Sequence, residues 1–155
     1  MNMGFSERWN TVAEQFAQHE AIRNSARQVT YKALGAQANA YACQLANLAI
    51  CNGCIAVLIP DPIDHIAALL GILLSGNYYY SISLERTSMI SQVLKSTGAE
   101  ALITSAHSIV ADQLDDSVLL IQSPISSLKP PPPPGQLTYR SIGSFLLIHD
   151  LWYYG

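Results

Sequence analysis

The run Cys-Ile-Ala-Val-Leu-Ile-Pro at residues 54–60 limits the fold of this chain more than any other feature. A continuous apolar run of this length is typical of a parallel β-strand that helices cover on both faces. Pro60 ends the run. Asp61 followed by Pro62 predicts the start of a helix, because aspartate caps helix N-termini and the proline ring suits the first helical position. The pattern therefore predicts a strand that leads directly into a helix.

Segments with the patterns of strands and helices alternate along the following part of the chain. Strands are predicted at residues 78–83, 100–104 and 117–121. Helices are predicted at residues 62–76, 89–97 and 106–114. Thr87 or Ser88 is expected to cap the second of these helices, and Gly98 to end it with a positive φ. The alternation predicts right-handed crossovers and an α/β fold with a mostly parallel sheet.

The N-terminal region predicts two helices joined by a hairpin. Apolar residues with helical spacing place one apolar face on a helix over residues 6–18; they are Phe5, Trp9, Val12 and Phe16. Short extended segments at residues 21–23 and 28–31 predict the hairpin. A second helix is predicted over residues 32–48. Its apolar face comprises Leu34, Ala38, Tyr41, Ala42, Leu45 and Leu48.

Charged residues make up only 12% of the 155 residues, about half the roughly 25% of an ordinary soluble domain. A surface this poor in charge indicates a piece of a larger protein or a subunit with a partner, with a charge-poor soluble domain as the alternative. The net charge of −3 argues against nucleic-acid binding. No apolar stretch of about 18 residues predicts a membrane span. An N-terminus without a secretory pattern and the presence of free-standing cysteines indicate a reducing, cytoplasmic location.

Titratable and thiol groups gather at two places in the sequence. Asp61, Asp64 and His65 form the tightest titratable cluster, but the cap position of Asp61 and the first-turn position of Asp64 favour a structural role. Cys51 and Cys54 form a C-x-x-C pair, which a redox or zinc site would use. Because no second Cys or His pair accompanies them, the structural interpretation is favoured there too.

Two further patterns do not amount to chemical motifs. The segment GILLSGNY, residues 71–78, has the glycine spacing of a phosphate loop. However, Asn77 and Tyr78 stand where a phosphate loop has the Lys and the Ser or Thr that hold phosphate and magnesium. The segment is also expected to end a helix, whereas a phosphate loop precedes one. The remaining candidate nucleophiles and bases show no nucleophile-elbow pattern; they are Ser81, Ser83, His107 and His149. We therefore assign no catalytic, cofactor-binding or metal-binding residue to this chain.

Two segments together resemble motifs of the adenylate-forming enzymes, the superfamily of acyl-CoA synthetases, luciferases and non-ribosomal peptide synthetase adenylation domains. VTYKAL, residues 29–34, is similar to the family's leucine-threonine-tyrosine-x-glutamate-leucine, with Ala33 in place of Glu. LLSGNYYYSIS, residues 73–83, is similar to L-K-A-G-x-A-Y-V-P-L-D. Gly76 and Tyr79 match this second motif, whereas three positions depart from it: Leu74 for Lys, Ser81 for Pro and Ser83 for Asp.

The resemblance covers roughly residues 5–121 and implies that residues 1–121 form the first part of the large N-terminal domain of such an enzyme, with an incomplete parallel sheet flanked by helices. The intact parent would use ATP and Mg²⁺ to activate a carboxylic or amino acid as an acyl-adenylate. The family's phosphate loop, magnesium-binding Glu and catalytic Lys have no counterpart in these 155 residues. We therefore expect this fragment to be inactive, to bind no cofactor, and to have the remainder of the adenylation domain as its partner.

Residues 122–155 break the alternating pattern and are expected to form an irregular Ser/Pro-rich tail. The family's phosphate loop, similar to F-T-x-S-G-T-T-G, should follow soon after residue 121. The codons that can encode residues 148–155 can also be read in a frame shifted by one base. With CTN as the leucine codon, the shifted frame permits Phe-Thr-Thr-Ser-Gly-Thr-Thr-Gly among its translations. The first glycine of this series is compulsory, because the Trp152 codon TGG followed by T always gives GGT in the shifted frame. We therefore predict that the residues after about 130–135 are frame-shifted coding for the phosphate-loop region, with an unrelated natural tail as the alternative.

Sequencing of the genomic DNA and transcript, from the codon of Ile121 to well past that of Gly155, tests this prediction. The expected result is that a one-base correction in the C-rich proline codons opens a frame that encodes the glycine-rich loop and continues. If the reported frame is right and no frame encodes the loop, the tail is authentic.

Two other functions remain open at the level of sequence. Five consecutive prolines at residues 130–134 favour polyproline II, so the chain could be a non-catalytic α/β interaction module whose tail binds an SH3-type domain. A small flavodoxin-like nucleotide-binding domain would also show alternating strands and helices. Titration of the tail peptide against SH3 and WW domains, and of nucleotides or flavins against the chain, would distinguish these alternatives.

Overall fold

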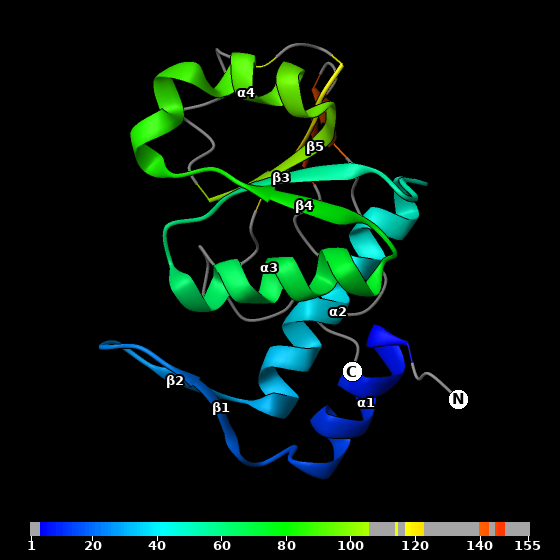
Figure 1. Cartoon of the computed structure of the whole chain (residues 1–155), viewed down its shortest axis with the longest axis vertical. Coiled ribbons are helices and arrows are strands. Elements are labelled where there is room, and N and C mark those ends of the chain that lie inside the picture. Colours follow the sequence, from blue (N-terminus) through cyan, green and yellow to red (C-terminus); the bar gives the residue numbers. More distant parts are fainter. Residues whose placement is uncertain (1–3, 106–113, 115–116, 123–139, 143–144, 148–155) are drawn as a thin grey trace.

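The computed structural model describes residues 4–105, 114, 117–122, 140–142 and 145–147 (Figure 1). The helices are α1 Phe5–Gln15, α2 Tyr31–Asn47, α3 Pro62–Leu74, the 3₁₀ helix η1 Leu84–Met89 and α4 Ile90–Thr97. The strands are β1 Glu20–Arg23, β2 Gln28–Thr30, β3 Cys54–Leu58, β4 Tyr78–Ser81, β5 Ala99–Thr104, β6 Leu119–Gln122, β7 Arg140–Ile142 and β8 Phe145–Leu147. No described helix is long and apolar enough to cross a bilayer.

The centre of the fold is a four-stranded sheet with the order β4-β3-β5-β6, in which every pairing is parallel. Figure 1 shows α2 and α3 on one side of this sheet and α4 on the other. The first crossover, through α3, places β4 next to β3, and the second crossover, through η1 and α4, places β5 on the opposite side of β3. The predicted α/β fold with an incomplete parallel sheet flanked by helices is confirmed.

Both faces of β3 are buried, as its continuous apolar sequence predicts. Ile55 and Val57 belong to the core cluster on the α2–α3 face, whereas Ala56 and Leu58 belong to the cluster on the α4 face. Successive side chains of a strand point to opposite faces, so a strand between two helical layers needs apolar residues at every position. Burial of a side chain such as Ile55 contributes about 1.5–3 kcal/mol.

The helix that follows β3 begins as its sequence predicts. The Asp61 side chain accepts hydrogen bonds from the backbone N–H groups of Ile63, at 3.0 Å, and Asp64, at 2.9 Å, and Pro62 occupies the first helical position. A cap of this kind contributes about 1 kcal/mol. It also fixes the direction in which α3 leaves the sheet.

The N-terminal region consists of α1, an antiparallel hairpin of β1 and β2, and α2, as predicted. Most of the predicted apolar face of α2 is buried, including Leu34, Tyr41 and Leu45, and Gln44 is buried with it. By contrast, α1 buries no residue completely. Figure 1 shows α1 and the hairpin beyond α2 and α3, away from the sheet.

The predicted cap of α4 at Thr87 or Ser88 is wrong. A 3₁₀ helix, η1, precedes α4, whose N-cap is Met89 without a side-chain cap hydrogen bond. The Thr87 hydroxyl instead donates to the carbonyl of Leu84 at 2.9 Å, so its donor is used within the 3₁₀ turn. The predicted C-terminus of α4 is confirmed, because Gly98 has a φ of 67°.

Other predictions fall where the structure gives little or no description. Of the predicted helix at residues 106–114, only Leu114 is described. The proline tract at residues 130–134 and residues 148–155 lie outside the described part of the chain. The boundary between residues 1–121 and the tail therefore stays a prediction.

Candidate functional site

A charged cluster links the hairpin to the start of α3. The Arg27 guanidinium donates from Nη2 to Oδ1 of Asp61 at 2.9 Å and to Oδ1 of Asp64 at 2.5 Å. Asn24 shapes the hairpin turn, because its Oδ1 accepts the backbone N–H of Ala26 at 2.9 Å and that of Arg27 at 2.8 Å. One arginine thereby ties the tip of the hairpin to the N-terminus of α3.

The two carboxyl groups of this cluster differ in their protonation behaviour. Burial raises the pKa of Asp64 and outweighs the opposing attraction of Arg27. Burial also acts on Asp61, but the N–H of Asp64 and the Arg27 guanidinium hold the pKa of Asp61 below its usual value. The difference follows exposure, since the Asp64 side chain is 7% exposed and that of Asp61 is 38% exposed.

The hydrogen bonds of the cluster support the structural interpretation of Asp61 and Asp64. One oxygen of Asp61 serves both the cap and Arg27, and Asp64 also pairs with Arg27. Among the described residues, no group of three His, Cys, Asp or Glu side chains could hold a metal ion. The cluster can therefore orient the hairpin, but the described side chains do not form a magnesium site.

His65 contacts a serine that lies on a neighbouring element. The Nε2 atom of His65 is 3.0 Å from Oγ of Ser81. This contact joins the first turn of α3 to the end of β4. A histidine beside a serine resembles part of a nucleophilic site, but a nucleophile also needs a third group that orients the base. The two residues are 16 positions apart in sequence, with most of α3 and of β4 between them, so no local motif could have predicted this contact.

Asn77, at the end of the segment with phosphate-loop spacing, has a structural role. Its amide oxygen accepts the N–H of Gly53 at 2.8 Å, and its amide nitrogen donates to the carbonyl of Ile50 at 3.0 Å. The same nitrogen lies 2.9 Å from Oγ of Ser75. The buried Asn77 side chain thus joins the turn before β3 to the turn before β4. The prediction that residues 71–78 end a helix and do not precede one is confirmed, because α3 ends at Leu74 and the strand β4 begins at Tyr78.

The C-x-x-C pair consists of two unlike thiols. Cys51 is exposed, whereas Cys54 is buried at the start of β3, and both are free. Burial raises the pKa of the Cys54 thiol, with a smaller contribution of the same sign from Glu100 and an opposing one from a Thr97 hydrogen bond. A raised pKa disfavours the reactive thiolate. The arrangement supports the structural interpretation of Cys54.

The topology of the sheet marks its carboxyl edge as a place for ligands. The chain changes direction between β3 and β5, and ligands of open α/β sheets bind outside the carboxyl ends of the strands at such a point. Here the buried hydroxyl of Thr104 donates to the carbonyl of Leu58 at 2.9 Å and joins the two strand ends. The Asp61 cap lies directly after this edge. Of the other candidates, His107 and His149 lie outside the described residues.

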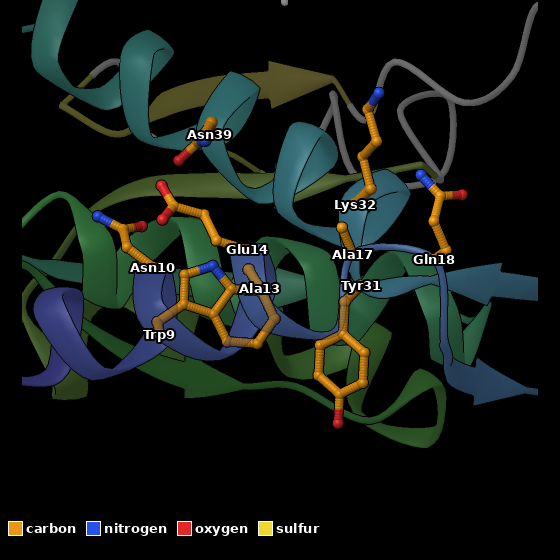
Figure 2. A pocket seen from close by; sticks show the side chains of 9 residues that line it. All are labelled: Trp9, Asn10, Ala13, Glu14, Ala17, Gln18, Tyr31, Lys32 and Asn39. Carbon is orange, nitrogen blue, oxygen red and sulfur yellow. The ribbon is translucent and has the colours of Figure 1, made fainter.

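A separate surface groove of about 440 Å³ lies between α1 and the beginning of α2 (Figure 2). The rings of Trp9 and Tyr31 lie in it with centroids 6.2 Å apart, and Glu14 and Lys32 are its charged lining residues. Figure 2 shows the Tyr31 and Lys32 side chains projecting in opposite directions. None of its lining residues belongs to β3, β5 or α3, so the groove is separate from the carboxyl edge of the sheet.

Comparison with solved structures finds the same fold in adenylation enzymes. The nonribosomal peptide synthetase FmoA3 in its AMPPNP-bound form matches with a TM-score of 0.66 and 22% identity, over 77% of this chain and 13% of that one. NpsA of Klebsiella oxytoca in complex with 3-hydroxyanthranilyl-AMSN matches with a TM-score of 0.67 and 20% identity, over 79% of this chain and 25% of that one. The NpsA N-terminal subdomain with the same ligand matches with a TM-score of 0.68 and 20% identity, over 79% and 31%.

The chain spans only part of these proteins, between 13% and 31% of their length. At 20–22% identity they show the fold, which is that of the N-terminal subdomain of adenylation enzymes. A search among curated proteins found no match. The sequence model of the AMP-binding enzymes matches residues 9–138, which is most of the chain. The chain therefore belongs to the AMP-binding enzyme family, as an N-terminal part of an adenylate-forming enzyme.

Proposed function

We propose that this chain forms the first part of the large N-terminal domain of an AMP-dependent ligase, whose complete form activates a carboxylic or amino acid with ATP. The family match over residues 9–138 carries this proposal. The partial coverage of the relatives supports the view that the chain works together with the remainder of such a domain. The reaction would join the acid to the α-phosphate of ATP and release pyrophosphate.

The role of the described residues in this function is to build the scaffold. An adenylation site needs donors for the phosphate oxygens and carboxylates for Mg²⁺. The carboxylates next to the sheet edge, Asp61 and Asp64, are both hydrogen-bonded to Arg27. We therefore assign the binding of ATP and Mg²⁺ to the remainder of the domain, and the positioning of the strand ends to this chain.

The purified 155-residue chain should show no acid-dependent exchange of pyrophosphate into ATP above a blank. The physical reason is that the chain supplies the sheet and its helices without the groups that hold the phosphates. The measurement is ATP–pyrophosphate exchange with a panel of carboxylic and amino acids. A complete ligase of known substrate serves as the positive control.

Two outcomes would contradict the proposal in different ways. Exchange by the isolated chain would show that these residues contain a working site. If the frame-corrected or otherwise complete protein also fails with every acid and binds no ATP, the proposed ligase function is wrong. Selective binding of the residue 129–135 peptide to an SH3 or WW domain would then favour the interaction-module alternative.

A further inference from the structure

The turn between α2 and β3 contains the pair Asn52–Gly53, and asparagine is followed by glycine nowhere else in the sequence. This pair is especially prone to deamidation, because glycine has no side chain that hinders attack by its backbone nitrogen on the asparagine amide. Asn52 is exposed to solvent, whereas Gly53 is buried. The reactive amide is therefore accessible to water, while the nitrogen that would attack it lies inside the fold.

The conformation of the turn favours these two residues. Asn52 has a φ of 55°, in the left-handed region that asparagine tolerates better than most residues. A Cβ at residue 53 would clash with the carboxylate of Glu100 and would lie 2.8 Å from Cγ2 of Ile50. Glycine alone fits there without displacing a neighbour. The turn thus favours an Asn-Gly pair and carries the chemical reactivity of that pair with it.

Asn77 holds the attacking nitrogen in the folded chain. The Oδ1 atom of Asn77 accepts the N–H of Gly53 at 2.8 Å, and its Nδ2 donates to the carbonyl of Ile50 at 3.0 Å. Beside them, the N–H of Tyr78 donates to the carbonyl of Gly53 at 3.0 Å. Asn77 is 5% exposed, so these bonds lie away from water. We call these three hydrogen bonds the Asn77 clamp. While it is closed, the nitrogen of Gly53 is not free to turn toward the Asn52 amide.

We propose that Asn52 is a deamidation site and that the Asn77 clamp controls the rate of its modification. When the clamp opens, the nitrogen of Gly53 bonds to Cγ of Asn52, the Cγ–Nδ2 bond of Asn52 breaks, and ammonia leaves with the proton of the Gly53 N–H. Water then opens the resulting succinimide ring at either carbonyl and gives aspartate or isoaspartate. Water is the only co-reactant. This inference does not depend on the proposed ligase function.

Deamidation would change the turn permanently. Both products place a new carboxylate in a turn against which the Glu100 carboxylate already lies. Isoaspartate also routes the main chain through its side-chain carbon, which lengthens the chain by a methylene group just before β3. The pairing of β3 with β4 begins at Cys54 and Tyr78, directly after this point. A modified chain should therefore open the clamp more readily than an unmodified one.

Peptide mass spectrometry of the full chain, incubated at neutral pH, tests the proposal by measuring how much Asn52 becomes aspartate and isoaspartate. Conversion should be at least about tenfold slower in buffer than in guanidinium chloride, because a buried turn held by several hydrogen bonds opens rarely. Equal rates in the two solutions would overturn control by the fold. If Asn52 stays intact in the unfolded chain, it is not a deamidation site.

Asn77→Ala tests whether the clamp is the part of the fold that controls the rate. Loss of the acceptor should raise the rate about two- to tenfold, the effect of one lost hydrogen bond on the opening of the turn. Asn77→Asp keeps an oxygen that accepts the N–H of Gly53, so its rate should stay close to that of the unmodified chain. Arg27→Met is the control for a general loss of stability, because Arg27 contacts Asp61 and Asp64 beyond the opposite end of β3.

Several results would contradict control by the clamp. They are an unchanged rate in Asn77→Ala, an equal increase in Asn77→Asp, or an equal increase in Arg27→Met. Circular dichroism checks that each variant is folded. Hydrogen exchange of the Gly53 amide in the unmodified chain needs no variant, because exchange and deamidation require the same opening. This amide should be protected, and exchange as fast as in the unfolded chain would overturn the proposal.

Discussion

Replacing Gly71 with alanine should lower the free energy of unfolding by about 1–3 kcal/mol, the usual cost of overpacking a core. Helix propensity alone predicts the opposite, because alanine is favoured over glycine inside a helix by about 1 kcal/mol. Packing decides the sign. A Cβ at Gly71 would lie 2.5 Å from the carbonyl oxygen of Ala38 and 2.5 Å from Cβ of Tyr41. The obstacles are the backbone and Cβ of α2, so α3 would have to move away from α2.

Gly35→Ala is the matched control for this prediction. Gly35 also lies within a helix, but a Cβ there would meet its nearest neighbours, side-chain atoms of Trp9 and Ala13, at 4.0 Å, an ordinary contact. This control should be neutral or stabilising by up to about 1 kcal/mol. Urea unfolding of the two variants and the unmodified chain measures both effects. Equal stability of the two variants would show that α2 and α3 do not pack as closely as the structure places them.

The elements that could be predicted from sequence are those with local causes. The apolar run at residues 54–60 predicts β3, because a strand buried on both faces needs apolar residues throughout. Asp61 and Pro62 predict the start of α3, because a cap depends on residues within one turn. Gly98 predicts the end of α4 for the same reason. The start of α4, which follows η1, has no side-chain cap, so no local residue pattern predicts where this helix begins.

The contacts that join the elements could not be predicted from sequence. Arg27 is separated by 34 residues from Asp61 and by 37 from Asp64, and Asn77 by 24 from Gly53. No periodicity or spacing links residues so far apart, because the fold alone brings them together. The interpretation of Asp61 and Asp64 as structural came from their helix positions, while their arginine partner became evident only in the structure.

Replacing Arg27 with methionine should lower the free energy of unfolding by about 1–3 kcal/mol at neutral pH. Removal of one partner from a buried pair costs about 3–5 kcal/mol, and the 32% exposure of the Arg27 side chain reduces this cost here. Methionine keeps much of the aliphatic length, so the main loss is the charge. The Asp64 carboxylate, with a 7% exposed side chain, would then be buried without a cationic partner.

The cost of Arg27→Met should diminish as the pH falls. Burial already raises the pKa of Asp64 in the folded chain, and without Arg27 that pKa should rise further. A carboxyl group with a raised folded pKa binds its proton more tightly in the folded than in the unfolded state. Its penalty is therefore complete above the folded pKa and is relieved as the pH falls toward the unfolded value of about 4. Urea unfolding between pH 7 and about pH 4.5 measures this change.

Arg23→Met separates the loss of this pair from the general loss of an arginine. Arg23 lies on the same hairpin and pairs with Glu20, but its side chain is 65% exposed and that of Glu20 is 39% exposed. Solvent screens such an exposed pair, so Arg23→Met should change the free energy of unfolding little. Adding Asp64→Asn to Arg27→Met should restore part of the lost stability, because no buried charge then remains. If Arg27→Met costs no more than Arg23→Met, or its cost is the same at every pH, Arg27 does not stabilise the fold by neutralising Asp64.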